Sequence, residues 1–526
     1  MKFPCLIFIA IISFSTSYKY LVYNPFFGYS HLNLLGSLSD VLTEGGHEVT
    51  ILMPEIEEDY LNQTGTELTK KIIRIPGDPR AVKMLKESKK TELRNVWSLS
   101  ASPMIMWKMT KNLTNMLTYQ CEYLMNDEHL LQSLREEKFD VGVAEAYYVC
   151  GLALFEALNI NTTIAMLSNI HLDSVTYAIG EPSFPSYVPG LMSTTGDRMT
   201  FSQRLQNVLA LIIGREISNY VNEKEIDVLR QKYGSFKDHY ELIAQTSFIF
   251  TRSNPYLDFP RPTLHKTVMI GGFEISRKLH KDFPLNKELS SFLDKHNRTI
   301  LISFGSVAKS ADMPDNYKKN ILAVFSSMSD VGFIWKYEDS KLDSSKPSNV
   351  LLSAWLPQVA LLKDKRLSAF LTHGGIGSCN EVAYMGKPAI IIPLFGDQMR
   401  NAQMMARQGG ALVLDKDDLS DADNLKNAFK AIINEPRYAK NALRLSQMLR
   451  NQPITPQELL LRHAEFAAKF GRFSNLDSYG RRLSTTQYYL LDIAAVAVII
   501  MILIAVAITA LVKRWCFSRH QKTKLD

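Results

Sequence analysis

Residues 355–403 bring an aromatic ring, a glycine-rich turn and the start of a helix together in one short stretch. A strand-like run delivers His373 and the Gly-Gly-Ile-Gly turn after it to the beginning of a helical pattern. Glycines let backbone N–H groups approach a ligand, and a helix N-terminus carries partial positive charge, so this turn suits a diphosphate. Glu381, one turn into the helix, can accept hydrogen bonds from ribose hydroxyls, and Trp355 offers a flat face to a base.

A glycine-rich turn taken alone is more often an ordinary strand-to-helix connection beside a structural tryptophan. The complete series of motifs is far more specific, since W-L-P-Q, F-L-T-H-x-G, S-x-x-E, G-x-P, P-L-F-G-D-Q and N-A follow one another in order. This series resembles the signature of the UDP-glycosyltransferase family, in particular the membrane-bound animal UDP-glucuronosyltransferases. The similarity extends over nearly the whole chain.

The resemblance implies how the nucleotide is held. Trp355 stacks on the uracil, Gln358 contacts the uridine and Glu381 binds the ribose hydroxyls. Four further residues are expected to hold the diphosphate: Ser306, His373, Gly375 and Ser378. The donor is a co-substrate, so no cofactor is expected, and the sequence contains no metal-binding motif.

The resemblance also implies how the transferred sugar is read. Asp397 and Gln398 contact its hydroxyl groups, and Arg252 reaches toward the donor. Gly377 stands where many relatives carry Asn, so one contact to the diphosphate or sugar is missing or is supplied by the backbone.

A catalytic pair is expected in the N-terminal half. His31 follows the first strand and its glycine turn, where the ends of strands in open α/β sheets face the ligand crevice, and G-Y-S-H resembles the family's catalytic motif. His31 is expected to act as general base on an acceptor hydroxyl, with inversion and no covalent intermediate. Glu145, at the end of the strand that begins near Asp140, is expected to stabilise the resulting imidazolium. Relatives commonly have Asp there, so Glu145 is one methylene longer.

The acceptor side is less informative. Aromatic and Met residues in 97–107 and 116–123 suggest an apolar wall suited to small lipophilic acceptors, although such stripes are more often core. The leading hypothesis is transfer of glucuronic acid from UDP-glucuronate to a hydroxyl, giving β-glucuronides. UDP-glucose is the alternative donor. A silent relative that binds nucleotide sugars or lipophiles is the hypothesis from another functional class.

The alternation of strand and helix patterns predicts the α/β class. A strand from Tyr18, a leucine-faced helix, a Gly45-Gly46 stop and a second strand form a βαβ unit, and a similar series begins at Thr299. We expect two Rossmann-like, doubly wound domains facing a cleft (the GT-B arrangement) and one C-terminal transmembrane helix. The expected segments are a signal peptide (1–17), an N-terminal acceptor domain (18–270), a C-terminal UDP-sugar domain (285–452), a helical segment before the membrane (453–487), a transmembrane helix (490–512) and a basic tail (513–526).

The two ends predict the topology. Residues 493–512 are twenty residues without a charge, enough to span a bilayer as a helix. Lys2 followed by an apolar run, with small residues at Ser15 and Ser17, is typical of a cleaved secretory signal. The basic tail then lies in the cytosol, which makes a single-pass type I protein with lumenal catalytic domains. Lys522 and Lys524 resemble the dilysine retrieval signal of the endoplasmic reticulum.

Composition excludes several classes of protein. With 46% hydrophobic residues in 526 the chain is not disordered, and five cysteines cannot form a disulfide scaffold. The tail has five basic residues against one acid, which accounts for +4 of the net charge of +7, so no nucleic-acid partner is expected.

The expected lumenal part contains three cysteines and four glycosylation sequons. Cys121, Cys150 and Cys379 are odd in number, so at least one stays free or pairs between chains. The oligomeric state, whether homo- or hetero-oligomer, is also open. Four glycosylation sequons fall in the lumenal part, at Asn62, Asn112, Asn161 and Asn297.

Overall fold

The computed structural model describes residues 17–522, except 27, 93, 99–102, 280, 282, 340, 341 and 343–345. The predicted signal peptide, apart from Ser17, and the end of the tail with Lys524 therefore lie outside the described residues.

The N-terminal lobe is built on a parallel sheet. Its strands follow the order β3-β2-β1-β4-β5-β6-β7, with these bounds: β1 (Lys19–Tyr23), β2 (Glu48–Glu55), β3 (Lys71–Pro76), β4 (Val141–Glu145), β5 (Thr163–Leu167), β6 (Phe248–Thr251) and β7 (Thr267–Met269). The helices are α1 (Tyr29–Glu44), α2 (Pro79–Lys90), α3 (Pro103–Met125), α4 (Glu128–Glu136), α5 (Cys150–Ala157), α6 (Asp173–Ile179), α7 (Phe201–Tyr233) and α8 (His239–Ala244). The order reverses between β1 and β4, as in a doubly wound fold.

The C-terminal lobe repeats this plan. Its parallel strands follow the order β10-β9-β8-β11-β12-β13, with these bounds: β8 (Arg298–Ser303), β9 (Val331–Lys336), β10 (Val350–Ser353), β11 (Leu367–Thr372), β12 (Ala389–Ile391) and β13 (Ala411–Val413). The helices are α9 (Phe273–Leu279), α10 (Lys287–Lys295), α11 (Asp315–Ser326), α12 (Gln358–Lys363), α13 (Ile376–Met385), α14 (Gln398–Arg407), α15 (Ala422–Asn434) and α16 (Pro436–Arg450). The two sheets confirm the expected α/β class.

Local sequence explains why these elements form. The first helix, α1, buries Leu32, Leu35, Leu38 and Leu42 on one side, the spacing expected of a helix packed on a sheet. The long helix α7 begins with a capping box, in which Thr200 and Gln203 satisfy each other's backbone N–H groups. Strands such as β4 and β5 are buried along their whole length, which is typical of parallel strands covered by helices on both faces.

The chain crosses between the lobes before it leaves them. The helix α17 (Pro456–Phe470) follows the C-terminal lobe, yet Leu460, Ala464 and Ala467 pack in the same cluster as Val22 and Phe250 of the N-terminal sheet. Within the expected helical segment 453–487, α17 therefore packs on the sheet of the first lobe.

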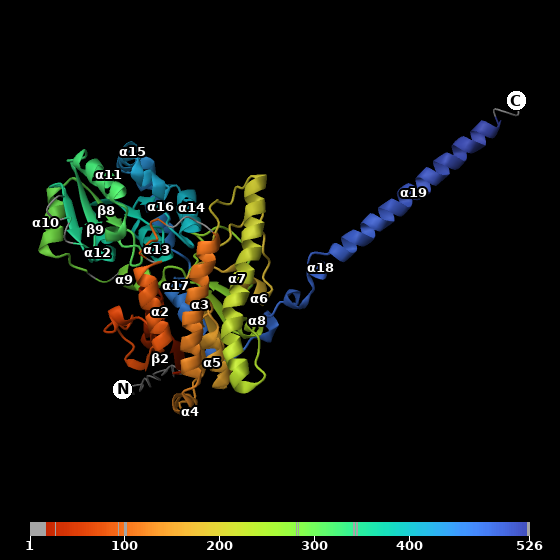
Figure 1. Cartoon of the computed structure of the whole chain (residues 1–526), viewed down its shortest axis with the longest axis horizontal. Helices are drawn as coiled ribbons and strands as arrows, with labels where there is room; N and C mark the ends of the chain where they lie inside the picture. Colours follow the sequence, from red (N-terminus) through yellow and green to blue (C-terminus); the bar gives the residue numbers. More distant parts are fainter. Residues whose placement is uncertain are drawn as a thin grey trace, which may run out of the picture.

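The last elements lead away from both lobes (Figure 1). After the 3-10 turn Tyr479–Arg482, a short helix α18 (Thr485–Tyr488) precedes the long helix α19 (Leu491–Lys522). Residues Leu491–Phe517 are long and apolar enough to cross a membrane, and none of the window tested is buried in the rest of the protein. The helix continues past the expected end of the span at residue 512.

The lobes also meet through residues 94–98, between α2 and α3. Val96 and Trp97 are buried in the core of the C-terminal lobe, where the Trp97 ring meets Phe304 edge to face at 4.8 Å. The indole N–H donates to the carbonyl of Lys309 at 2.8 Å. This contact fixes the turn after β8 against the first lobe.

Candidate active site

Both lobes turn the reversal points of their sheets toward the predicted site. Tyr23 of β1 pairs with Ala144 of β4, so His31 and Glu145 emerge from neighbouring strand ends. In the second lobe Ser303 of β8 pairs with Thr372 of β11, which brings the turn containing Ser306 beside His373. Ligands of open α/β sheets bind at these reversal points.

The structure brings His31 and Glu145 into direct contact. Nδ1 of His31 lies 2.7 Å from Oε2 of Glu145, whose side chain is only 5% exposed. The other oxygen of Glu145 accepts from the backbone N–H of Ser168 at 3.3 Å. Burial alone would raise the pKa of Glu145, but the charge and hydrogen bond of His31, together with Ser168, lower the pKa below its ordinary value. Glu145 is therefore a carboxylate, and its longer side chain still reaches the histidine.

The His373 ring packs closely against two glycine turns, one containing Gly305 and the other Gly374 and Gly375. A Cβ on Gly305, whose φ is +85°, would lie 2.7 Å from Cε1 of His373, so only glycine allows the imidazole this position. Burial, with a smaller effect of the Lys336 charge, lowers the pKa of His373 to about 4. The imidazole is therefore neutral at physiological pH and can donate one hydrogen bond to an anion without adding charge.

Three polar residues of α12 and α13 form a connected group. The amide nitrogen of Gln358 donates to Oγ of Ser378 at 3.2 Å and to Oε2 of Glu381 at 2.6 Å. Burial raises the pKa of Glu381, and the bond from Gln358 only partly opposes this. The group presents two acceptors and a hydroxyl at the edge of the turn, as a nucleoside site requires.

Trp355 is the exposed aromatic of the site. It is 54% exposed and meets the ring of Tyr29, at the start of α1, edge to face at 5.4 Å. The ammonium group of Lys336 lies 6.0 Å from the Trp355 ring centre. An accessible ring in a mainly buried site is what stacking on a base needs.

Asp397 and Gln398, which are expected to contact the transferred sugar, have different hydrogen-bond partners in the structure. Asp397 accepts from the amide of Asn401 at 2.7 Å, and burial raises the pKa of Asp397. The amide oxygen of Gln398 accepts from the backbone N–H groups of Leu394 and Phe395 at 2.8 and 3.1 Å, so that oxygen shapes the loop.

Arg252 lies at the end of β6 and points toward the start of α13. Its guanidinium makes a forked ion pair with Glu274 of α9, and a Cβ built on Gly377 would lie 3.0 Å from Nη2. The missing side chain at position 377 thus leaves room that Arg252 fills. Nη1 also approaches the carbonyl oxygen of Ser168 at 3.5 Å.

Sequence reasoning missed three residues that the structure places in this network. Glu274 lies in an unremarkable linker helix, and Ser168 acts through its backbone, so neither leaves a motif. Tyr147 follows Glu145 by two residues; burial raises the pKa of its phenol to about 12, with the charges of Asp397 and Glu145 adding to the effect. The position of Tyr147 just after a strand end could have identified it.

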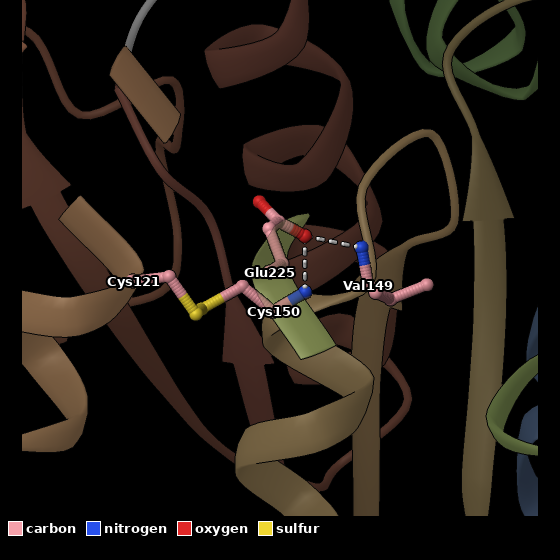
Figure 2. The surroundings of a disulfide bond; sticks show 4 residues. All are labelled: Cys121, Val149, Cys150 and Glu225. Carbon is pink, nitrogen blue, oxygen red and sulfur yellow. Dashed lines mark hydrogen bonds between the residues drawn. A yellow bond between two sulfur atoms is a disulfide. The ribbon is translucent and has the colours of Figure 1, made fainter. Parts of the chain in front are cut away.

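A disulfide and a buried carboxylate hold the loop after β4 (Figure 2). Cys121 of α3 is bonded to Cys150 of α5, and Cys379 is free and buried, which agrees with the odd count of cysteines. Glu225 of α7 accepts from the backbone N–H groups of Val149 and Cys150 at 2.8 and 2.9 Å. The loop that follows Glu145 is therefore fixed to both α3 and α7.

The four sequon asparagines differ in their exposure. Asn62, Asn161 and Asn297 are exposed, whereas Asn112 is half-buried and its amide donates to Glu92 at 2.8 Å.

Among the residues that the structure describes, no group of three or more His, Cys, Asp or Glu side chains could hold a metal ion.

Comparison with known proteins gives the family. Residues 21–524 match the family model described as "UDP-glucoronosyl and UDP-glucosyl transferase". The Caenorhabditis elegans protein ugt-48, which carries a UDP-glucuronosyltransferase name, is 29% identical over 97% of this chain and 97% of its own. Human UDP-glucuronosyltransferase 1A8 is 26% identical over 90% of this chain and 88% of its own.

Solved structures share the fold. A Phytolacca americana glycosyltransferase, UGT2, solved with UDP-2-fluoroglucose and pterostilbene, superposes with a TM-score of 0.54 at 15% identity, covering 86% of this chain and 100% of its own. The glycosyltransferase VinC, solved with dTDP, gives 0.55 at 17% identity over 85% of this chain and 100% of its own. Both neighbours have the two-lobed GT-B fold, which confirms that expectation. The chain therefore belongs to the family of UDP-glucuronosyl and UDP-glucosyl transferases.

Proposed function

We propose that the protein transfers glucuronic acid from UDP-glucuronate to a hydroxyl group of small lipophilic acceptors, with inversion to the β-glucuronide. The observation that carries this proposal is the contact between His31 and Glu145 at 2.7 Å, at a sheet reversal point of a family member. Curated relatives that match over most of their length bear UDP-glucuronosyltransferase names, which supports glucuronate as donor sugar.

The chemistry follows from the orientation of the dyad. Since Nδ1 of His31 faces the carboxylate of Glu145, Nδ1 carries the hydrogen and Nε2 is the base. Nε2 takes the acceptor's proton as its oxygen attacks the anomeric carbon, and the bond from that carbon to the diphosphate oxygen breaks on the opposite face. UDP leaves with the bonding electrons. The carboxylate of Glu145 stabilises the imidazolium that forms.

The remaining residues bind the donor in this proposal. Trp355 stacks on the uracil, while Gln358 and Glu381 hold the uridine and ribose. Asp397 and Gln398 contact the sugar. The diphosphate lies against the α13 N-terminus, where these residues surround it: Arg252, Ser306, His373, Gly375 and Ser378. The neutral imidazole and the helix N-terminus together suit an anion.

UDP-glucose remains a second candidate donor because of one specific feature. Arg252 is assigned to the diphosphate, and Arg400 of α14 is fully buried and paired with Asp258 at 2.5 Å. Neither arginine is therefore available to the carboxylate of glucuronate, whereas a neutral hexose needs no charged partner.

The membrane arrangement is part of the proposal. The apolar helix α19 would span the bilayer once, with the two lobes in the lumen of the endoplasmic reticulum and the basic tail in the cytosol. The lobes would correspond to residues 18–270 for the acceptor and 285–452 for the donor. The three exposed sequons are then available for glycosylation, at Asn62, Asn161 and Asn297.

A donor panel tests the proposal. Membranes containing the full chain are incubated with a simple phenol and UDP-glucuronate, UDP-glucose, UDP-N-acetylglucosamine or UDP-xylose, and the conjugate is identified by mass. His31→Ala should abolish the product. No transfer from any donor to several acceptor classes would refute the enzyme, and undiminished transfer by His31→Ala would refute the mechanism. The sugar found on the phenol decides between the two donors.

A further inference from the structure

The β5 segment, residues 168–171 directly after β5, lies between the catalytic pair and the predicted diphosphate contact. Met166 of β5 pairs with Glu145 of β4, and the last residue of β5 pairs with the last residue of β6, which Arg252 follows. Because parallel strands end at the same edge of a sheet, Glu145, the β5 segment and Arg252 emerge side by side.

The backbone of the β5 segment contacts both of these residues. The N–H of Ser168 donates to Oε1 of Glu145 at 3.3 Å. On the other side, the carbonyl of Asn169 accepts from the backbone N–H of Arg252 at 3.3 Å, and the carbonyl oxygen of Ser168 lies 3.5 Å from Nη1 of the guanidinium. A displacement of this short stretch would therefore change the surroundings of the catalytic carboxylate and of the arginine together.

The far end of the segment is held by both lobes. Ile170 is buried in the core of the C-terminal lobe, in the same cluster as Phe370. The backbone N–H of His171 donates to Oγ of Ser253 at 3.2 Å, and the carbonyl of His171 accepts from the guanidinium of Arg261 at 3.4 Å. The β5 segment thus ends at a residue whose backbone is fully engaged.

The side chain of His171 is paired with a buried carboxylate. Nε2 of His171 lies 2.5 Å from Oε1 of Glu181, and neither side chain is exposed. The other oxygen of Glu181 accepts from the N–H of Leu264 at 2.9 Å and from the hydroxyl of Thr267, the first residue of β7, at 2.7 Å. Burial alone would raise the pKa of Glu181, but the charge and hydrogen bond of His171, with those two donors, lower the pKa below its ordinary value. Glu181 is therefore a carboxylate that attaches His171 to the edge of the sheet.

Polar contacts continue from His171 to the helix on the sugar side. The hydroxyl of Ser253, which accepts from the N–H of His171, donates to Oδ2 of Asp258 at 2.7 Å. Asp258 in turn pairs with Arg400 of α14, the helix that begins at Gln398. The end of the β5 segment is thus connected to the second lobe by a continuous series of buried contacts.

The pair of His171 and Glu181 acts without touching a ligand. Both side chains are fully buried, so neither reaches the cleft. The cost of desolvating two such groups offsets most of their attraction, so a buried pair adds little net stability, whereas loss of one partner is damaging. Its effect lies in fixing one geometry, and here that geometry is the path of the β5 segment.

We propose that His171 and Glu181 are positioning residues of the active site. Through the β5 segment they hold Glu145 against His31 and direct Arg252 toward the diphosphate of the donor. The roles of these last three residues are those of the proposed function, on which the inference rests. Loss of the pair should therefore appear in two separate measurements, the affinity for UDP and kcat.

Two replacements of His171 separate its contact from its size. In His171→Gln the amide nitrogen takes the place of Nε2 and still donates to Glu181, whereas the shorter amide of His171→Asn reaches only the place of Nδ1. Calorimetric titration of the purified full chain should show UDP binding weakened about 5–50-fold in His171→Asn, as for coupled contacts in one polar network, and within about 3-fold of wild type in His171→Gln. Uridine, which lacks the phosphates, should bind equally to all three proteins.

A double-mutant cycle distinguishes positioning from general support of the fold. In an Arg252→Ala background, His171→Asn should change the UDP affinity less than about 2-fold, because its effect passes through the guanidinium. Full weakening in that background would overturn the proposal. Thr267→Val removes one hydrogen bond to Glu181 without leaving an unpaired charge, so it carries the test if His171→Asn does not fold, and it should weaken UDP binding about 2–5-fold. Wild-type UDP affinity in Thr267→Val, and in His171→Asn where it folds, would overturn the proposal as well.

His47 supplies the matched control. It is also a buried histidine beside a glutamate, with Nε2 lying 3.3 Å from Glu465, but it precedes β2 and so lies at the sheet edge opposite the site. His47→Asn should lower the Tm and leave the affinities for UDP and uridine unchanged. If His47→Asn weakens UDP binding as much as His171→Asn does, the loss reflects a damaged fold and the positioning role is wrong.

Initial rates give the second measurement. His171→Asn should lower kcat at saturating substrates about 10–100-fold, since small misplacements of catalytic groups have effects of this size, and His171→Gln should retain most of the activity. In a Glu145→Gln background the same change should have little further effect, and an equal fall in both backgrounds would contradict positioning through Glu145. The rates require a transferase, whereas the UDP titrations do not, so a donor panel without product would leave the affinity test decisive.

Discussion

Arg252, which directly follows β6, forms a forked ion pair with Glu274 of the helix α9. Nη2 of Arg252 lies 2.9 and 2.8 Å from the two oxygens of Glu274, and Nε lies 3.2 Å from Oε2. The same guanidinium approaches the carbonyl of Ser168, whose N–H donates to Glu145. One short segment after β5 therefore connects the predicted diphosphate contact to the predicted catalytic pair.

We predict that Glu274→Gln weakens UDP binding about 5–30-fold, because a charge-assisted bond worth about 1–2 kcal/mol orients the guanidinium. Uridine, which lacks the phosphates, should bind unchanged. Calorimetric titration of both ligands measures the difference, and Glu288→Gln, an exposed acid on α10, controls for the lost charge. Equal weakening of uridine would mean that Glu274 supports the fold instead, and tighter UDP binding would mean that it screens Arg252.

We predict that Gly377→Asn also weakens UDP binding, although many relatives carry Asn there. A Cβ at position 377 would lie 3.0 Å from Nη2 of Arg252, so a longer side chain must displace the guanidinium. Overpacking of this kind costs about 1–3 kcal/mol, which corresponds to about 5–150-fold in affinity. Gly377→Ala should have a smaller effect than Gly377→Asn in the same titration. An Asn variant that binds UDP more tightly would show that this site accepts the relatives' contact.

The catalytic pair gives a prediction in kcat. Glu145→Gln keeps an oxygen for Nδ1 of His31 but removes the charge that stabilises the imidazolium, so kcat should fall about 10²–10⁴-fold with little change in KM for the donor. Glu145→Asp keeps the charge at a greater distance and should retain more activity. Initial rates at saturating donor and acceptor measure this, with thermal unfolding as a check on folding. A Glu145→Gln enzyme with wild-type kcat would exclude Glu145 from the reaction.

The sequence alone locates in the fold those candidate site residues that share one motif or end one strand. His373, Ser378 and Glu381 lie on a single turn and helix, and Glu145 ends a strand, so spacing and topology place them. The same logic predicts the α/β class, since strand and helix patterns alternate in order.

Contacts between distant segments could not be predicted in this way. Nothing in the sequence near Glu274 indicates that it pairs with Arg252, because the pairing depends on how α9 packs after β6 and β7. Trp97 suggested an acceptor wall, yet it is buried in the core of the other lobe. Leu460 and Ala464 have an ordinary amphipathic spacing, which does not say which sheet they cover.

Glu225 gives a prediction for stability against pH. Burial raises its pKa from 4.5 to about 7, although the N–H groups of Val149 and Cys150 act in the opposite direction. The folded state thus holds the proton more tightly than the unfolded state, so its contribution is complete below the unfolded pKa of 4.5 and is lost as the pH rises through about 7. The loss amounts to about 3 kcal/mol at most, at 1.36 kcal/mol per pKa unit.

Glu225→Gln keeps an oxygen for the same two N–H groups but does not titrate. The variant should therefore gain stability relative to the wild type as the pH rises from about 5 to about 8, and the two should be similar at the acidic end. Thermal unfolding of the purified full chain at several pH values measures this. Glu216→Gln, an exposed acid on the same helix, should follow the wild type throughout. If Glu225→Gln and wild type keep a constant difference in Tm over this range, Glu225 does not change its protonation there, and the loop after β4 is held by a permanent charge.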